Sequence, residues 1–146
     1  MLISQKPANG TKMNLTLIDT SVWIEYFRGN SQIIITIHWL LDNNLAVTAF
    51  PVRMELLIGA RNQERKSITE AFGGLLFCDI QKSAWEIAEK WIIILREKGI
   101  TPSLIDVLLV AVAKENLYSF WTLDKDFEPM FKYCKVQKFD SLKISA

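Results

Sequence analysis

Residues 17–23, with the sequence LIDTSVW, place an aspartate directly behind a short apolar run and in front of two hydroxyl side chains. The run from 14 to 18 predicts a buried strand. Thr20 or Ser21 can cap the helix that follows, and Gly29 can end it. Because ligands of parallel sheets bind beyond the carboxyl ends of the strands, Asp19 is the first candidate for a functional side chain. An aspartate in this position can also be only a cap or a turn residue.

Strands and helices alternate along the rest of the chain. Further strands are predicted at 45–50, 75–80, 118–122 and 135–139. Helices are predicted between them, at 32–41, 51–62, 63–72, 84–99 and 103–116. This alternation predicts a three-layer α/β/α fold around a central parallel sheet of about five strands. We expect residues 14–146 to form a single domain, preceded by a polar N-terminal extension at 1–13.

The composition is that of a globular protein, with 50% hydrophobic and 23% charged residues among 146. The net charge of +1 argues against a nucleic-acid binder held by net charge alone, but it leaves room for a local basic patch. The N-terminus lacks the apolar segment of a signal peptide. No apolar run approaches the roughly 20 residues of a membrane helix, so we expect no membrane attachment.

The two cysteines, Cys78 and Cys134, are far apart and lack the spacing of a metal site. We interpret them as reduced thiols, one in a strand and one in a loop. Because reduced thiols are typical of cytoplasmic proteins, we expect a cytoplasmic location.

Four more acidic residues can join Asp19 at one site. Asp124 and Asp126 follow the predicted strand at 118–122, and they would lie near Asp19 if the first and fourth strands were neighbours. Glu55 and Asp106 stand among apolar residues in predicted helices, where a bare carboxylate is costly unless something compensates it. No lysine or arginine lies close to Asp106 in the sequence, so its partner should be a metal ion or a residue from elsewhere in the chain.

Some of these acids have a simpler explanation when taken singly, such as a solvated helix position for Glu55 or a turn for Asp124. Together, acids at strand ends and acids in apolar helices indicate one acidic pocket. Clustered carboxylates repel one another, and a hard divalent cation relieves the repulsion. Because the ligands are oxygens without histidine or cysteine, the pocket predicts Mg²⁺ or Mn²⁺ rather than zinc.

Four segments carry a family resemblance. They are LIDTSVWIEYFRG at 17–29, PVRMELLIGARN at 51–62, ITPSLIDVLLVAVAKEN at 100–116 and FWTLDKDF at 120–127. In this order they resemble the motifs of PIN-domain ribonucleases, in particular the VapC-type toxins of bacterial toxin–antitoxin systems. The resemblance extends over residues 15–139, and Thr122 and Asp124 occupy the T-x-D positions of the last motif.

The resemblance implies a metal-dependent endoribonuclease toxin that cleaves cellular RNA and is inhibited by a cognate antitoxin. Mg²⁺ or Mn²⁺ would be its cofactor. The implied catalytic residues are Asp19, Glu55, Asp106 and Asp124, and the implied metal ligands are Asp19, Asp106, Asp124 and Asp126.

Neighbouring side chains could support this chemistry. Thr20, Ser21 and Thr122 could orient the carboxylates through hydrogen bonds, although a capping or turn role would explain each of them as well. RNA binding requires contacts to phosphates. The candidates for these contacts are Arg28, Arg53, Arg61 and Lys125, each of which could also be a solvated surface charge.

The predicted helices at 20–28 and 32–41, and the run WIIIL at 91–95, are rich in large apolar residues. Core packing accounts for most of them. The surplus fits a groove that receives an antitoxin segment, together with a homodimer face elsewhere. In the family the antitoxin wraps this region, so the resemblance implies a VapB-like partner. His38, on the second of these helices, is interpreted as a structural or partner-facing residue.

Three alternatives require different chemistry. A response-regulator receiver would need adjacent acids after the first strand, where this chain has only Asp19. A catalytically silent PIN-like module could bind RNA or a protein without cutting, but the intact set of acids argues against it. A DNA nuclease of the same fold class would be larger and carry extra helices. Metal-dependent RNA cleavage that a single carboxylate change abolishes would separate the endoribonuclease from all three.

Overall fold

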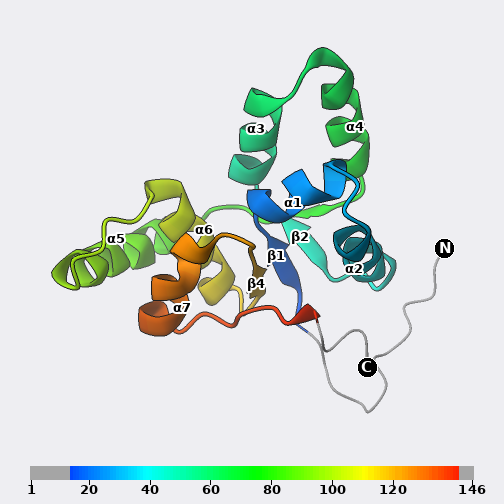
Figure 1. The fold of residues 1–146 in the computed structure, drawn as a ribbon. Coiled ribbons are helices and arrows are strands. Elements are labelled where there is room, and N and C mark those ends of the chain that lie inside the picture. The colour runs from blue at the N-terminus through cyan, green and yellow to red at the C-terminus, as the bar shows by residue number, and fades with distance from the viewer. Residues whose placement is uncertain (1–13, 142–146) are drawn as a thin grey trace, which may run out of the picture.

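The computed structural model describes residues 14–141, so the predicted extension at 1–13 and the end of the predicted domain at 142–146 lie outside the described residues. Within them, four short strands form one parallel sheet (Figure 1). They are β1 (Thr16–Ile18), β2 (Ala46–Thr48), β3 (Leu76–Phe77) and β4 (Ser119–Trp121), in the order β3-β2-β1-β4. The prediction of a parallel α/β sheet is confirmed. β1 and β4 are neighbours in the sheet. This is the condition under which Asp124 and Asp126 were expected to lie near Asp19.

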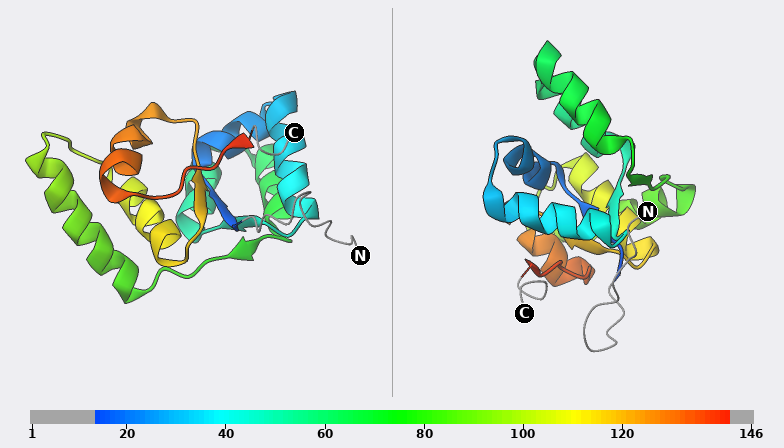
Figure 2. Two further views of the ribbon diagram at one scale, coloured as in Figure 1. Left: turned by 90° about the horizontal axis from the view of Figure 1, so that it is seen from below. Right: turned by 90° about the vertical axis from the view of Figure 1, so that its right-hand side faces the viewer.

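Helices cover both faces of this sheet. Those described are α1 (Thr20–Phe27), α2 (Ser31–Asp42), α3 (Phe50–Gly59), α4 (Asn62–Phe72), α5 (Lys82–Glu97), α6 (Leu104–Glu115) and α7 (Glu128–Cys134). The first four gather on one side of the strands and the last three on the other (Figures 1 and 2). Right-handed crossovers explain this division, because the chain moves one way along the sheet from β1 to β3 and then returns across it to β4. The predicted three-layer architecture is confirmed.

The predicted fifth strand at 135–139 is wrong. This segment lies beside β4, where the Phe120 N–H donates to the Gln137 carbonyl at 2.8 Å and the Phe139 N–H donates to the Phe120 carbonyl at 3.0 Å. The contact amounts to a single bridge between Phe120 and Lys138. The buried residues of the segment, Val136 and Phe139, are three positions apart, which does not fit the period of two of a strand. The short helix α7, which precedes this segment, was not predicted.

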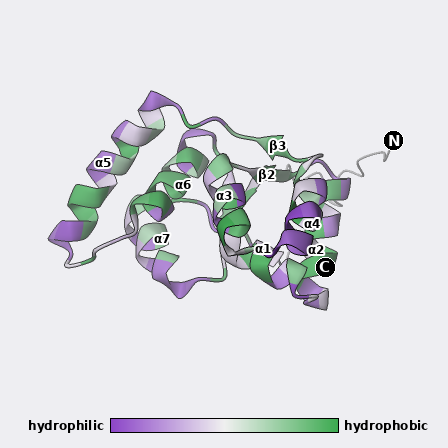
Figure 3. Cartoon of the chain, turned by 90° about the horizontal axis from the view of Figure 1, so that it is seen from above, coloured by the Kyte–Doolittle hydropathy of each residue, from purple (hydrophilic) through white to green (hydrophobic). Residues whose placement is uncertain are grey.

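The core lies between the sheet and its helices, and α6 contributes a continuous buried run at 107–113. The ribbon of α6 is strongly hydrophobic, whereas that of α4 is hydrophilic (Figure 3). A helix that is apolar on all sides is stable only when neighbouring elements cover it. In the part of the chain that the structure describes, no helix is long and apolar enough to cross a membrane.

Both cysteines are buried free thiols. Cys78 follows β3 rather than lying within a strand, and Cys134 ends α7 rather than lying in a loop, so both placements differ from the prediction. Burial raises the pKa of both thiols, that of Cys134 to about 11. Because the thiolate is the form that binds metals, these residues are poor candidates for a metal site.

Three helices end in the same backbone motif, in which one residue adopts a left-handed conformation. Asn44 (φ 55°) follows α2, Gly99 (φ 78°) follows α5 and Leu117 (φ 60°) follows α6. The next N–H group bonds back to the last helical turn at 2.8 to 2.9 Å in each case. Glycine and asparagine suit this conformation, but leucine is strained in it. The Leu117 side chain is 76% exposed. The free energy gained from burying this side chain therefore compensates for little of the backbone strain.

Leu117→Gly is expected to raise the free energy of unfolding by about 1 kcal/mol, because it removes the left-handed strain and sacrifices little buried apolar area. Urea unfolding followed by circular dichroism would measure the change. Asn44→Leu is the matched change in the opposite direction and should destabilise the protein by a similar amount. An unchanged or lower free energy of unfolding for Leu117→Gly would contradict this explanation.

Candidate active site

Asp19 stands between β1 and α1, and only 5% of its surface is exposed. Its backbone N–H donates to the Trp121 carbonyl at 2.8 Å, which ties it to the end of β4. The Ser21 and Thr122 hydroxyls each donate to Asp19 Oδ2 at 2.8 Å. Although Asp19 occupies the cap position of α1, its side chain makes no capping hydrogen bond. A capping role therefore does not explain this carboxylate.

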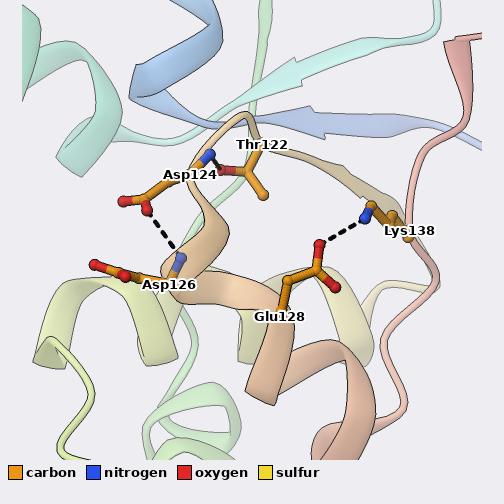
Figure 4. A network of polar contacts seen from close by, with 5 residues as sticks. All are labelled: Thr122, Asp124, Asp126, Glu128 and Lys138. Carbon is orange, nitrogen blue, oxygen red and sulfur yellow. Dashed lines mark hydrogen bonds and ion pairs between the residues drawn. The ribbon is translucent and has the colours of Figure 1, made fainter.

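The same two hydroxyls hold the loop that follows β4. The Leu123 N–H donates to Ser21 Oγ at 3.0 Å, and the Asp124 N–H donates to Thr122 Oγ1 at 3.0 Å (Figure 4). A hydroxyl has one proton and two lone pairs. Because both protons go to Asp19, the Ser21 and Thr122 oxygens, 3.2 Å apart, share no proton with each other. Both hydroxyls thus lie where the sequence analysis expected orienting groups.

Asp124 and Asp126 lie at the surface just beyond β4. The Asp126 N–H donates to Asp124 Oδ1 at 2.9 Å and opens a short 3₁₀ helix, η1 (Lys125–Phe127) (Figure 4). This contact is a typical turn stabilised by an aspartate. Asp124 therefore forms the turn through Oδ1, as the simpler explanation expected. Its Oδ2 makes no hydrogen bond within the described residues.

Glu55 reaches the site from α3. The Thr20 hydroxyl, in the first turn of α1, donates to Glu55 Oε2 at 2.8 Å. The expectation that Glu55 stands in an apolar environment is wrong, because the residue is exposed. Its apolar neighbours Met54 and Ile58 are themselves 58% and 84% exposed, so they do not enclose the carboxylate.

Asp106 lies in the first turn of α6, where the helix dipole favours a carboxylate. It is half-buried rather than enclosed, because the continuous buried run starts at the next residue. Even so, its pKa is raised from 3.8 to about 6. Burial is the largest cause of this shift. The rest comes from the negative charges of Asp19, Glu55, Asp124 and Asp126.

The structure therefore brings the four other predicted acids within electrostatic range of Asp106. Within residues 14–141, no three acidic, histidine or cysteine side chains already form a cage for a metal ion. Asp19 Oδ1 and Glu55 Oε1 make no hydrogen bond in the described structure, so each acid keeps an oxygen that could bind a cation. His38 is engaged elsewhere, since its Nε2 lies 3.0 Å from a tyrosine hydroxyl of α1.

A family model described as PIN domain matches residues 16–130. The chain belongs to the PIN-domain family. Ribonuclease VapC3 of Methanocaldococcus jannaschii is 33% identical to it over 97 residues, which make up 66% of this chain and 95% of that protein.

Solved structures share the fold of this PIN domain. VapBC from Salmonella typhimurium, bound to DNA, aligns with a TM-score of 0.72 and 16% identity over 88% of this chain and 99% of the matched chain. VapBC-1 from nontypeable Haemophilus influenzae aligns with a TM-score of 0.70 and 19% identity over 87% of this chain and 98% of the matched chain. Because these identities are low, the likeness concerns the fold.

The predicted RNA-binding residues are spread over the PIN domain. Lys125 lies in η1, between two of the acids. Arg28 pairs with a glutamate of α1 at 3.0 Å. The Arg53 guanidinium lies 5.9 Å from the centre of the Phe77 ring, and Arg61 is exposed at the start of α4. The structure thus places one of the four beside the acidic residues.

Asp106→Asn is expected to stabilise the metal-free PIN domain at neutral pH. The wild-type carboxyl has a pKa of about 6 in the folded protein against an ordinary value of 3.8. The folded state therefore binds more protons than the unfolded state between these values, and stability falls as the pH rises through them. Because Asp106 is only half-buried, solvent screening reduces the cost to about 1 kcal/mol.

Urea unfolding in EDTA, near neutral pH and again near pH 4, would test this effect of Asp106. The variant should be more stable than the wild type at the higher pH only. Asp79→Asn, which removes an exposed carboxylate outside the site, is the control for losing an acid. Equal stability of Asp106→Asn and wild type at neutral pH would show that burial and the neighbouring charges do not destabilise the ionised Asp106 carboxylate.

Proposed function

We propose that residues 14–146 form one catalytic domain, a metal-dependent endoribonuclease of the VapC toxin type. The observation that carries the proposal is the convergence of acids from the end of β1, from α3, from α6 and from the loop after β4. Burial, and after it the charges of the other acids, raise the pKa of Asp106, so the site favours the uptake of positive charge. The relative with 33% identity is named a ribonuclease, which supports the same activity here.

The side chains at the site fit a hard divalent cation. The available donors are carboxylate oxygens, which suit Mg²⁺ or Mn²⁺. PIN-domain VapC nucleases are generally dependent on divalent metals. A bound cation would offset the charge of the carboxylates and of the RNA phosphate, and would lower the pKa of a water molecule. The residues that would hold it are Asp19, Asp106, Asp124 and Asp126.

The other residues of the site would position these groups. The two hydroxyl donors on Asp19 Oδ2 fix the direction in which Oδ1 points. The Thr20 hydroxyl holds Glu55 by Oε2, which leaves Oε1 able to accept a proton from an attacking water. Lys125 would bind a phosphate of the RNA next to the acids. The residues proposed for phosphates farther along the strand are Arg28, Arg53 and Arg61.

A catalytically silent binding module is the second candidate. The observation in its favour is that no three of the described acidic, histidine or cysteine side chains form a finished metal cage. Mutual repulsion explains this spacing, because like charges move apart when no cation holds them together. The free oxygens of Asp19 and Glu55 and the raised pKa of Asp106 favour the enzyme.

Asp19→Asn is expected to keep the fold and to slow RNA cleavage by more than about 100-fold. The amide keeps the shape of the side chain but removes the charge of a ligand, and even residues that only support metal ligands typically contribute 10–100-fold. The assay would use purified protein, freed of antitoxin, with total cellular RNA in Mg²⁺, Mn²⁺ or EDTA. Discrete fragments should form with either metal ion and disappear in EDTA.

Asp79→Asn is the matched control for Asp19→Asn, and it should cut at the rate of the wild type. Cleavage by Asp19→Asn at the wild-type rate would remove Asp19 from the catalytic site. No cleavage by the folded wild type under any condition would favour the silent module.

The proposed toxin would be neutralised by a VapB-like antitoxin. Most apolar residues of α1 and α2 belong to the core, as expected, but Ile24, Phe27 and Ile35 are 39%, 36% and 61% exposed. Exposed apolar surface of this kind suits a partner segment. The solved structures with this fold include VapBC toxin–antitoxin complexes. A cytoplasmic location agrees with two free thiols and with an RNA substrate.

A second apolar surface lies on α3, where Phe50, Met54 and Ile58 are 54%, 58% and 84% exposed. These residues are one helical turn apart, so they form a continuous stripe. We assign this stripe to a homodimer face, because one self-complementary patch is enough to build a twofold dimer.

Ile58→Lys is expected to convert the dimer into a monomer, because it places a charge in the apolar stripe. Light scattering after size exclusion would show a mass of twice 16.8 kDa for the wild type and 16.8 kDa for the variant. Ile93→Lys is the control, since Ile93 is a 60% exposed isoleucine on α5. A dimer that survives Ile58→Lys, or a monomeric wild type, would contradict the assignment.

A further inference from the structure

Tyr133, in the last turn of α7, has two lysine ammonium groups against its ring. Lys98 Nζ lies 5.4 Å and Lys132 Nζ 5.2 Å from the ring centre. Lys98 comes from the end of α5 and Lys132 from α7, so the cluster is built by tertiary packing and not by one helix face. Two like charges next to one aromatic ring repel each other, and an anion would relieve that repulsion.

An open pocket of about 350 Å³ lies at this cluster, lined by Ile100, Glu128, Pro129, Lys132 and Tyr133. Isoleucine, proline and the tyrosine ring give it apolar walls, and lysine gives it a positive charge. This combination resembles the way in which proteins hold single-stranded nucleic acid, with bases stacked on aromatic rings and phosphates bound by cations.

The charge of the pocket is not neutralised by the protein itself. Glu128 is its acidic residue, and Glu128 pairs with Lys138 at 2.7 Å (Figure 4). Within residues 14–141, neither Lys98 nor Lys132 forms an ion pair with an acid. Both lysines are exposed, so their ammonium groups can leave the Tyr133 ring and follow an arriving phosphate.

A short stretch of chain joins the pocket to the acidic site. Glu128, the first residue of α7, follows Asp126 by two positions, and its carboxylate points away from Asp126 toward Lys138 (Figure 4). Seven residues of helix rise by about 10 Å, which corresponds to about three stacked nucleotides along one strand. An RNA strand of a few nucleotides is therefore long enough to span the part of the chain that separates Asp126 from Tyr133.

We infer that this pocket is a subsite for single-stranded RNA, in which Tyr133 stacks on one unpaired base while Lys98 and Lys132 bind the phosphates on either side of it. The inference rests on the proposed ribonuclease function and adds to it a site that holds the substrate away from the acids. Bases in a duplex are already stacked on one another, so a lone aromatic ring selects an unpaired strand. The two lysines also supply attraction for a polyanion that the nearby carboxylates repel.

The test measures the affinity for a short fluorescein-labelled single-stranded RNA by fluorescence anisotropy, at low and at physiological salt. All proteins would carry Asp19→Asn so that the RNA stays intact. Lys98→Ala with Lys132→Ala should weaken binding at low salt by at least about tenfold and reduce the salt slope by about 1.4, since each phosphate contact to a single strand contributes about 0.7. Tyr133→Leu should weaken binding about tenfold without changing the salt slope.

Lys82→Ala with Lys90→Ala is the matched control, because it removes the same charge from exposed positions nearer the other end of α5. It should leave the affinity within about twofold of the Asp19→Asn parent. Tyr133→Leu should leave the affinity for duplex RNA of the same length unchanged.

Cleavage of RNA by the protein with Asp19 intact, measured in parallel, separates two kinds of failure. If this protein cuts RNA but the double lysine variant binds single strands with unchanged affinity and slope, the subsite is wrong and the ribonuclease stands. If the lysine variant instead loses only the binding of a protein antitoxin, the pocket is a protein site and the inference is overturned. If the intact protein neither cuts nor binds RNA, the proposed function fails and the subsite with it.

Discussion

The hydrogen bonds from Ser21 and Thr122 to Asp19 Oδ2 join the two chain segments on which the site depends. Asp19 and Thr122 are 103 residues apart in the sequence, yet they follow strands that are neighbours in the sheet. The same two hydroxyls accept N–H groups from the loop after β4, so this loop is positioned relative to Asp19. Glu55 is held from the same place, because Thr20, the first residue after Asp19, donates to it. Residues 19–21 and Thr122 thus position acids that come from separate parts of the fold.

Partial burial of a carboxylate among other acids costs stability, and Asp106 shows this cost. It stands at a helix end that favours a negative charge, yet its pKa is raised to about 6. The same helix compensates further along, where residues 107–113 are all buried. Each large apolar side chain in such a position contributes about 1.5–3 kcal/mol. The buried part of α6 therefore compensates for the unfavourable charge of Asp106 in its first turn. This arrangement is expected where a charged group serves function rather than folding.

Much of the fold could be predicted, because alternating strands and helices have strong local signals and the order of parallel strands places their carboxyl ends together. The placement of Asp19 and Asp124 at the same edge of the sheet followed from that rule. The environment of Glu55 was predicted wrongly, because the apolar residues beside it lie on an exposed stripe, and a pattern of apolar residues does not distinguish an interface from a core. The helix α7 was missed because seven residues are too few to show a period. The contact of Lys98 with Tyr133 exists only through tertiary packing, so no local signal could reveal it.

Binding of Mn²⁺ to the metal-free protein, followed by electron paramagnetic resonance, tests the central claim most directly, because it depends on neither the RNA nor the antitoxin. The claim is that Asp19, held by its two hydroxyl donors, organises a cation site. It predicts saturable binding by the wild type, loss of that binding in Asp19→Asn, and affinity reduced by about 10–100-fold in Thr122→Val, which removes a supporting hydroxyl without removing a ligand. Equal Mn²⁺ binding by the wild type and Asp19→Asn would contradict it.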